Sequence, residues 1–172
     1  MLSTLRLWYP SDVVALLIDV AVLALWGTGV GYAFHRMPAS WFSDDRAVTR
    51  LRSWERDGRV WDDLVAVRRW KGRLPDAGGL FSSGFPKKQM SARDSDYLRR
   101  FVAETRRAEL VHLVVLAIGP VFFLWNPLWL AAVMVVYGVL ANVPFIIIQR
   151  YNRARLLRVL AHRSRPPRQP EA

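Results

Sequence analysis

The chain has 172 residues, of which 52% are hydrophobic, and it carries a formal net charge of +11. In a soluble protein this charge would favour nucleic-acid binding. Here the apolar residues gather into long runs, which indicates a membrane protein, so we expect no nucleic-acid partner. The absence of cysteine excludes disulfides, thiolate nucleophiles and cysteine metal sites.

The first apolar run covers residues 13–34 and reads VVALLIDVAVLALWGTGVGYAF. At 1.5 Å per residue it is long enough to cross a hydrocarbon core of about 30 Å. It follows Asp12 rather than a basic cluster, and no clean small-residue cleavage site comes after it. We therefore expect a retained transmembrane helix rather than a signal peptide. Asp19 lies within the run, and we expect it to face the helix bundle or a polar headgroup.

The central segment, 35–108, mixes aromatic and basic residues, a composition typical of an amphipathic layer at the headgroup level. Its pattern predicts short helices over 44–56 and 59–71. A stretch rich in Gly, Pro and Ser then predicts a loop over 73–88, and a further helix is expected to start near Asp94 and run on into the membrane.

Two more apolar runs, 109–125 and 128–148, are separated by Asn126 and Pro127. Proline suits a turn or the first position of a new helix, and the intervening sequence carries no charge. The two runs therefore predict a tight helical hairpin. The tail, 163–172, is rich in Pro and Arg and is expected to be disordered.

Lysine and arginine concentrate in the central segment and the tail, whereas the N-terminal leader and the hairpin turn are nearly free of them. The positive-inside rule then places the central segment and C-terminus in the cytoplasm and the N-terminus outside. The predicted fold is an all-α integral membrane protein of the cell membrane, multi-pass, with about three transmembrane helices and amphipathic cytoplasmic interfacial helices. We expect residues 1–162 to form a single membrane domain.

Two carboxylates and a histidine at the start of the second apolar run are the strongest candidates for chemistry. Glu109 and His112 share one face of a helix, and Glu104 lies at the edge of the same surface. Charged groups in an apolar run are costly, and histidine is suited to proton transfer near neutral pH. We therefore predict His112, Glu109 and Glu104 as catalytic residues. Arg106 and Arg107 point elsewhere, and we expect them to contact lipid phosphates.

The hairpin determines what faces this surface. Counting outward from Asn126 places His112 opposite residue 140 and Glu104 near Arg150. Two polar clusters far apart in sequence should thus form the walls of a cleft at the cytoplasmic interface. The candidates for substrate binding on the second wall are Asn142, Gln149, Arg150, Asn152 and Arg153.

Structural explanations remain open for several of these residues. Arg153 could be an interfacial anchor, Glu104 and Arg150 could form an ion pair that fixes the hairpin, and Asn142 could simply bond across helices. The ExxH spacing at 109–112 is that of dimetal sites in helical bundles, but such sites need a second ExxH, which the sequence lacks. We therefore expect no metal.

Three stretches carry a resemblance to a known family: RRWKGRLPDAGGLF (68–81), FVAETRRAELVH (101–112) and NVPFIIIQRYNRARL (142–156). They resemble the glycosyl-4,4'-diaponeurosporenoate acyltransferase family, small membrane proteins of carotenoid pigment biosynthesis. The resemblance implies transfer of a fatty acyl group onto a sugar hydroxyl of a glycosylated carotenoid acid. The HxxxxD pattern of glycerolipid acyltransferases and the G-x-S-x-G elbow of hydrolases are both absent.

Acyl transfer to an alcohol needs a base for the hydroxyl proton and donors for the oxyanion. We expect His112 to be the base, oriented by Glu109 or Glu104, with no covalent enzyme intermediate. The candidate oxyanion donors are Asn142, Gln149 and Arg150.

The expected acyl donor is acyl-CoA or another acyl carrier acting as co-substrate, and no further cofactor is expected. Arg150, Arg153, Lys87 and Lys88 are predicted to hold its phosphates. The expected partners are membrane lipid and a hydrophobic glycosylated acceptor. Three short spans leave little room for a buried cavity in a monomer, so a homo-oligomer is an alternative.

Two other functions fit the same residues. The small size and arginine-rich face also suit a non-catalytic membrane module that binds an anionic lipid or a membrane protein. An acyltransferase acting on a different glycolipid or polyprenyl acceptor is the other alternative. Genomic neighbourhood would separate them, since carotenoid desaturase and glycosyltransferase genes would favour the enzyme.

Overall fold

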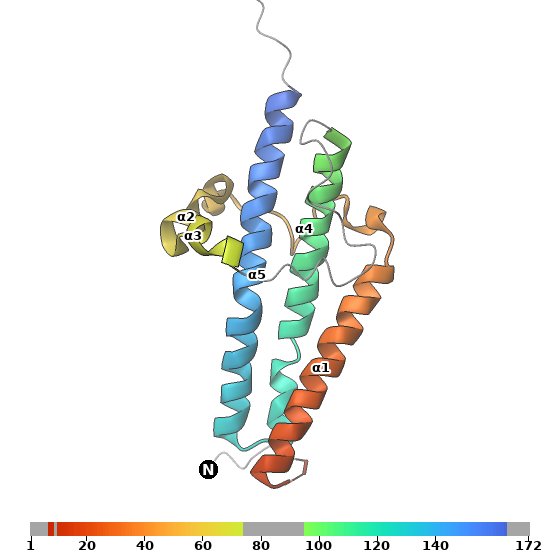
Figure 1. The fold of residues 1–172 in the computed structure, drawn as a ribbon, viewed down its shortest axis with the longest axis vertical. Coiled ribbons are helices and arrows are strands. Elements are labelled where there is room, and N and C mark those ends of the chain that lie inside the picture. The colour runs from red at the N-terminus through yellow and green to blue at the C-terminus, as the bar shows by residue number, and fades with distance from the viewer. Residues whose placement is uncertain (1–6, 9, 74–94, 165–172) are drawn as a thin grey trace, which may run out of the picture. The chain divides into compact units, whose positions relative to one another are not determined.

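The computed structural model describes residues 7–8, 10–73 and 95–164, and this part of the chain is helical, without a strand (Figure 1). Three long helices dominate it: α1 (Asp12–Arg36), α4 (Ser95–Leu116) and α5 (Leu128–Arg163). The shorter elements, where η denotes a 3-10 helix, are η1 (Ala39–Phe42), η2 (Ser53–Gly58), α2 (Arg59–Val65), α3 (Val67–Trp70), η3 (Lys71–Arg73) and η5 (Gly119–Leu124).

Three stretches are long and apolar enough to cross a membrane, namely Asp12–Arg36, Ser95–Leu124 and Leu128–Arg163. Helical structure bonds most backbone groups within the same segment, which is what a segment that crosses a bilayer requires. The predicted class, an all-α membrane protein with one N-terminal helix and a helical hairpin, is confirmed.

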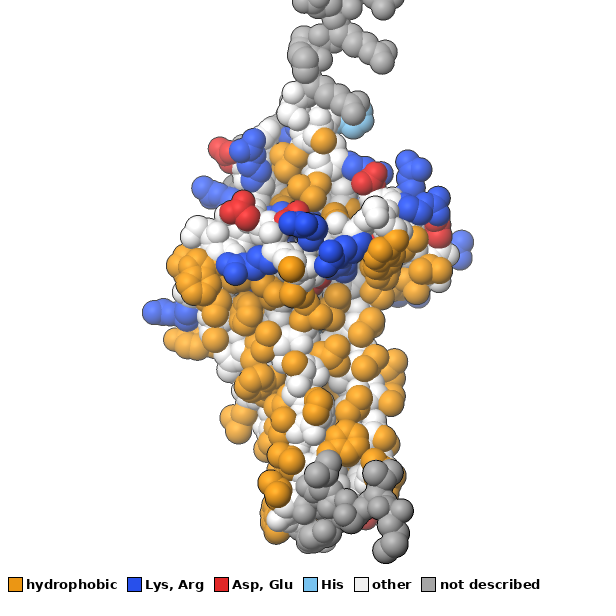
Figure 2. All heavy atoms as spheres, turned by 180° about the vertical axis from the view of Figure 1, so that it is seen from behind, with side chains coloured by type: hydrophobic (Ala, Val, Ile, Leu, Met, Phe, Trp, Pro, Cys, Tyr) orange, Lys and Arg blue, Asp and Glu red, His pale blue; other side chains and the backbone are white. Residues whose placement is uncertain are grey.

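The chain divides into two compact units. Unit 1 comprises Met1–Pro38 and Arg107–Ile146, and unit 2 comprises Ala39–Arg106 and Ile147–Ala172. On the face drawn in Figure 2, hydrophobic side chains cover the helices of unit 1, whereas Lys, Arg, Asp and Glu gather over unit 2. Unit 1 thus has the surface of a lipid-embedded bundle, and unit 2 has that of an interfacial layer.

The hairpin of unit 1 is not built from two uninterrupted α-helices. The sequence predicts one helix over 109–125, but α4 ends at Leu116 and the short 3-10 helix η5 follows. Pro120 accounts for the break, because it lacks the N–H that would bond the carbonyl of Leu116 and its ring would crowd that carbonyl. The turn itself lies at Asn126 and Pro127, where the sequence predicts it.

The 3-10 segment also shifts the register of the hairpin. Counting along two α-helical arms places His112 opposite residue 140, but its hydrogen-bond partner is Asn142. A 3-10 helix rises about 2.0 Å per residue, roughly 0.5 Å more than an α-helix. Over the 6 residues of η5 the first arm therefore gains about 3 Å, the rise of two α-helical residues.

Helix α1 is tied to this hairpin by polar contacts at two depths. Asp19 Oδ1 accepts hydrogen bonds of 2.8 Å from Trp125 Nε1 and 2.8 Å from Asn126 Nδ2, and Trp26 Nε1 donates to the Val114 carbonyl at 3.2 Å. Asp19 is fully buried, so the prediction that it faces the bundle is confirmed. Between these contacts lies an apolar core built around Phe122, Ala131 and Met134.

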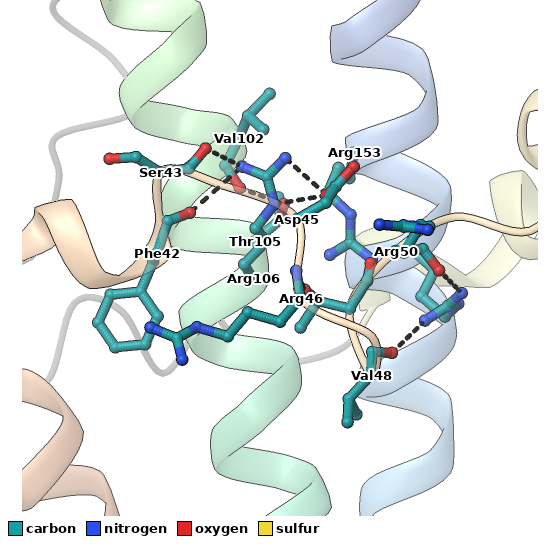
Figure 3. A network of polar contacts seen from close by, with 12 residues as sticks. Phe42, Ser43, Asp45, Arg46, Val48, Arg50, Val102, Thr105, Arg106 and Arg153 are labelled. Atoms are coloured by element: carbon teal, nitrogen blue, oxygen red, sulfur yellow. Dashed lines mark hydrogen bonds and ion pairs between the residues drawn. The ribbon is translucent and has the colours of Figure 1, made fainter.

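In unit 2, residues 44–52 do not form the first half of the predicted helix 44–56. Helical structure begins only at Ser53 with η2. The backbone carbonyls before it accept hydrogen bonds from arginine side chains of α4 and α5 (Figure 3). Because these long-range donors occupy the carbonyl groups, the segment follows an irregular path along the two helices. The prediction of helix over 44–52 is therefore wrong.

The short helices of unit 2 pack against α5 (Figure 1). Val67 of α3 is fully buried in a cluster with Ile148 and Tyr151. Gly58 precedes α2 with a φ of 85°, and a Cβ at this position would come within 2.9 Å of the Ala154 Cβ. Glycine is thus required twice, for its left-handed backbone and for the close approach to α5.

Several predictions fall on other parts of the chain. The helix expected from Asp94 is α4, whose described part starts at Ser95, and α5 continues past the expected end of the third span to Arg163. Most of the loop 73–88, with Lys87 and Lys88, lies outside the described residues, as does nearly all of the tail 163–172.

Candidate active site

A hydrogen bond joins the two arms of the hairpin in unit 1. His112 Nδ1 lies 3.0 Å from Asn142 Oδ1, and Asn142 Nδ2 donates to the Gly138 carbonyl at 2.9 Å. The second contact fixes the orientation of the amide, because only its nitrogen can donate to a carbonyl. Asn142 Oδ1 is therefore an acceptor, His112 Nδ1 carries the proton, and Nε2 of the neutral ring holds a lone pair.

The ring of His112 is held on its face as well as its edge. It stacks on Phe145 with ring centroids 4.8 Å apart and planes inclined by 9°. His112 is half-buried, whereas Asn142 is almost fully buried. Among the described residues, Asn142 is the hydrogen-bond partner of His112, through Nδ1. A fixed imidazole with a lone pair on its second ring nitrogen is suited to general-base chemistry.

An apolar cavity of about 210 Å³ adjoins this pair within unit 1. Asn142 lines it at one end, and residues of α1, α4, η5 and α5 complete the wall. Its lining residues are Leu23, Val115, Leu116, Ile118, Gly119, Phe122, Met134, Val135, Tyr137, Gly138, Ala141 and Asn142. His112 is not one of the lining residues and is linked to the cavity through its hydrogen bond to Asn142.

The two predicted catalytic glutamates have different surroundings. Glu109 belongs to unit 1, lies one turn before His112 on α4 and is 1% exposed. Glu104 belongs to unit 2 and lines a separate cleft of about 780 Å³. We predict from sequence that a glutamate orients His112, but the structure gives that place to Asn142, which we predict as a substrate-binding residue.

Arg150 is bound by a glutamate that sequence reasoning does not single out. Its guanidinium forms an ion pair with Glu55, which also accepts hydrogen bonds of 2.7 Å from the Arg52 backbone N–H and 3.0 Å from Trp61 Nε1. Burial by itself would raise the pKa of Glu55, but the hydrogen bonds from Arg150, Arg52 and Trp61 outweigh it and hold the pKa below its ordinary value. Glu55 is thus a charged anchor for Arg150.

The remaining predicted residues of the second wall also lie in unit 2. Arg153 is fully buried and donates to the Thr49 carbonyl. Asn152 accepts a hydrogen bond of 3.1 Å from Lys71 Nζ, which lies 4.8 Å from the centroid of the Tyr151 ring. Gln149 is partly buried. Arg150 and Arg153 both bond to groups of segment 39–58, so both arginines stabilise the position of that segment against α5.

Arg106 is the clearest departure from the sequence prediction. It is 6% exposed and does not face lipid, so the expected contact with lipid phosphates is wrong. Its guanidinium forms an ion pair of 2.7 Å with Asp45 and donates to the carbonyls of Phe42 and Ser43 (Figure 3). No local pattern in the sequence indicates this contact, because the partners lie about sixty residues apart.

Within the described residues, no group of three or more His, Asp or Glu side chains is placed to hold a metal ion. The site that the structure assembles in unit 1 consists of a candidate base, a positioning amide, a stacked aromatic ring and an adjoining apolar cavity.

Comparison with known proteins places the chain among acyltransferases. Residues 38–162 match the profile of the family described as glycosyl-4,4'-diaponeurosporenoate acyltransferase. Proteins with this name from Staphylococcus aureus strains bovine RF122 / ET3-1, USA300 and MRSA252 are each 32% identical over 126 residues, covering 73% of this chain and 75% of the relative. No solved structure matches. The chain therefore belongs to the glycosyl-4,4'-diaponeurosporenoate acyltransferase family and is an acyltransferase of the membrane.

Proposed function

We propose that this protein transfers a fatty acyl group onto a sugar hydroxyl of a glycosylated diaponeurosporenoate, or of a related glycolipid, at the cytoplasmic face of the membrane. The name of the relatives supports the acceptor class. The observation that carries the chemistry is the His112–Asn142 hydrogen bond, which leaves Nε2 of a fixed imidazole as a base beside an apolar cavity.

In the proposed reaction the sugar hydroxyl oxygen attacks the carbonyl carbon of the acyl donor. His112 Nε2 takes the hydroxyl proton as the new C–O bond forms. When the donor is a thioester, its C–S bond then breaks and the imidazolium returns the proton to the departing thiolate. Asn142 keeps the second N–H of its amide for the developing oxyanion. No covalent enzyme intermediate is required.

The acyl donor is proposed to be acyl-CoA or another acyl carrier that arrives from the cytoplasm. Lys87 and Lys88, outside the described residues, stay predicted phosphate contacts. Glu109 stays a predicted catalytic residue because its buried carboxylate lies one turn from His112 on α4. A homo-oligomer stays an alternative to a monomer.

The cytoplasmic placement can be tested independently of activity. The chain contains no cysteine, so single cysteines can be introduced on a clean background. We expect Asp63→Cys, on the exposed surface of α2, to react with a membrane-impermeant thiol reagent only after the cells are opened. Asp12→Cys, at the start of α1, should react in intact cells. The opposite pattern would reverse the proposed orientation.

The test of the proposed chemistry is replacement of His112 by alanine and by glutamine, each of which removes the base. Cells that make the glycosylated acceptor should accumulate it without the acyl group, as measured by mass spectrometry of extracted pigment, while the protein level stays unchanged. His162→Ala is the matched control, because His162 lies exposed near the end of α5. Acylated product at the normal level in both His112 variants would sink the assignment.

A further inference from the structure

The cavity of unit 1 has a gradient of polarity along its length. Asn142, hydrogen-bonded to His112, lies at one end, while the other lining residues are apolar or glycine except for Tyr137. Leu23 and Phe122 belong to the part of unit 1 nearest the hairpin turn, so the space extends from the candidate base toward that turn. A ligand that fits this space has one polar group followed by an apolar chain.

We propose that this cavity binds the fatty acyl chain that is transferred, with its carbonyl end toward Asn142 and His112, and that Gly138 sets the length of chain accepted. The inference rests on the proposed function, because it assigns the hydrocarbon part of the acyl donor to a place beside the proposed base.

The size of the cavity favours an acyl chain over the carotenoid. An engineered apolar cavity of about 150 Å³ binds benzene, so a cavity of about 210 Å³ can hold a segment of a hydrocarbon chain. A saturated chain can bend to enter such a space one segment at a time. A long conjugated polyene is rigid, and only a small part of it would fit.

Two glycines, Gly119 and Gly138, line the cavity beside larger side chains. A Cβ added at Gly138 would meet the Leu116 Cδ1 at 3.7 Å, and a Cβ at Gly119 would meet the Val135 Cγ2 at 3.4 Å. Both neighbours line the cavity, and these separations are close to ordinary van der Waals contact, so a larger side chain at Gly138 would extend into the cavity. The Asn142 contact would persist, since it uses the backbone carbonyl of residue 138.

The first experiment compares the acyl chains on the product made by Gly138→Ala, Gly138→Leu and the unchanged protein. Each is expressed in cells that make the acceptor and contain fatty acids of several lengths. Burial of one methylene group is worth about 0.8 kcal/mol, so losing room for one lowers kcat/KM for the longer chain about fourfold. A leucine side chain takes the room of several methylene groups. Gly138→Leu should therefore lower the ratio of long-chain to short-chain product at least tenfold. Gly138→Ala should produce a smaller shift in the same direction.

Val136→Leu is the matched control, because it adds bulk on the same helix at a residue that is 57% exposed and outside the cavity. It should leave the chain-length profile unchanged. An unchanged profile in Gly138→Leu, or an equal shift in Val136→Leu, would overturn the assignment of the cavity. Loss of all product in the His112 variants together with an unchanged Gly138→Leu profile would refute the cavity proposal and retain the proposed base.

A binding experiment separates the acyl donor from a membrane lipid. The full chain in detergent micelles is irradiated with a photoreactive fatty acyl-CoA or with a phospholipid that carries the same photoreactive chain. We expect the acyl-CoA probe to label peptides covering 115–122 and 134–142, and Gly138→Leu to reduce this labelling severalfold. Labelling of these peptides by the phospholipid alone would make the cavity a lipid site and contradict the proposal, whatever the result of the His112 variants.

Discussion

Asn142 holds His112 in a single orientation, with Oδ1 3.0 Å from the ring Nδ1 and with its own amide anchored 2.9 Å from the Gly138 carbonyl. The contact joins α4 to α5 across the hairpin, so the state of the candidate base depends on the packing of two helices. Asn142 is accordingly a positioning residue for the base in addition to its proposed contact with the oxyanion.

Replacing Asn142 by leucine should lower kcat by about 10²-fold or more while KM changes little, because the base loses its orientation and the acceptor for its Nδ1–H. Asn142→Asp keeps the acceptor for the Nδ1–H but loses the amide N–H groups that bond the Gly138 carbonyl and the oxyanion, so its kcat should lie between those of the leucine variant and the unchanged protein. Steady-state kinetics on membranes that contain each variant would measure both. Equal loss in the leucine and aspartate variants would show that His112 does not need this acceptor.

The ion pair between Glu55 and Arg150 should make the stability of unit 2 depend on pH. The pKa of Glu55 is lower in the folded protein than its ordinary value of 4.5, so the charged form stabilises the fold above that value. This contribution should be lost as the pH falls through the lower, folded-state pKa. The fluorescence of Trp61, which donates to Glu55, provides the readout in an acid titration in micelles.

Glu55→Gln is the companion variant. It should destabilise unit 2 by about 1.5–3 kcal/mol, because the partly buried Arg150 would exchange a charged acceptor for a neutral amide oxygen. Its fluorescence should also lose the acid transition assigned to Glu55. A variant that retains the same transition would assign it to another carboxyl group.

The contacts of Arg106 predict that lysine cannot replace it. A guanidinium can reach Asp45 and two backbone carbonyls together, whereas an ammonium group cannot match that geometry. Arg106→Lys should cost about 1.5–3 kcal/mol in the anchoring of the segment after α1, and hydrogen–deuterium exchange there should accelerate. Arg99→Lys, at an exposed arginine of the same helix, should leave the exchange unchanged. Equal acceleration in both variants would argue against a specific anchor.

Asp19 should be needed for the attachment of α1 to the hairpin turn. Asp19→Leu leaves the buried N–H groups of Trp125 and Asn126 without their acceptor, at a cost of about 1–3 kcal/mol. Asp19→Asn retains an acceptor oxygen, so its unfolding temperature should lie close to that of the unchanged protein. Thermal unfolding in micelles, followed by near-ultraviolet circular dichroism, would test the difference, with Asp12→Asn at the exposed start of α1 as control. A large loss in Asp19→Asn would mean that the negative charge itself is required.

The sequence by itself determines the membrane helices, the hairpin turn and the interfacial segment, because each depends on residues that are neighbours along the chain. The apolar runs 13–34 and 128–148 are long enough to cross a bilayer as helices, the run 109–125 is marginal in length by itself, and Pro127 in an uncharged break places the hairpin turn. Counting from that turn brings His112 within two residues of its observed partner, and the error comes from Pro120 and the longer rise of η5. The mixture of aromatic and basic residues predicts that 35–108 is an interfacial segment.

Only the tertiary structure decides the path of residues 39–58 and the role of Asn142. Four carbonyls between Phe42 and Arg50 accept hydrogen bonds from arginines more than sixty residues further along the chain, which are donors that no local sequence window contains. The amide of Asn142 is likewise oriented by its hydrogen bond to the Gly138 carbonyl on α5, and its oxygen contacts the His112 ring on α4. Residue type supplies the donors and acceptors, and the packing of the helices selects the pairs.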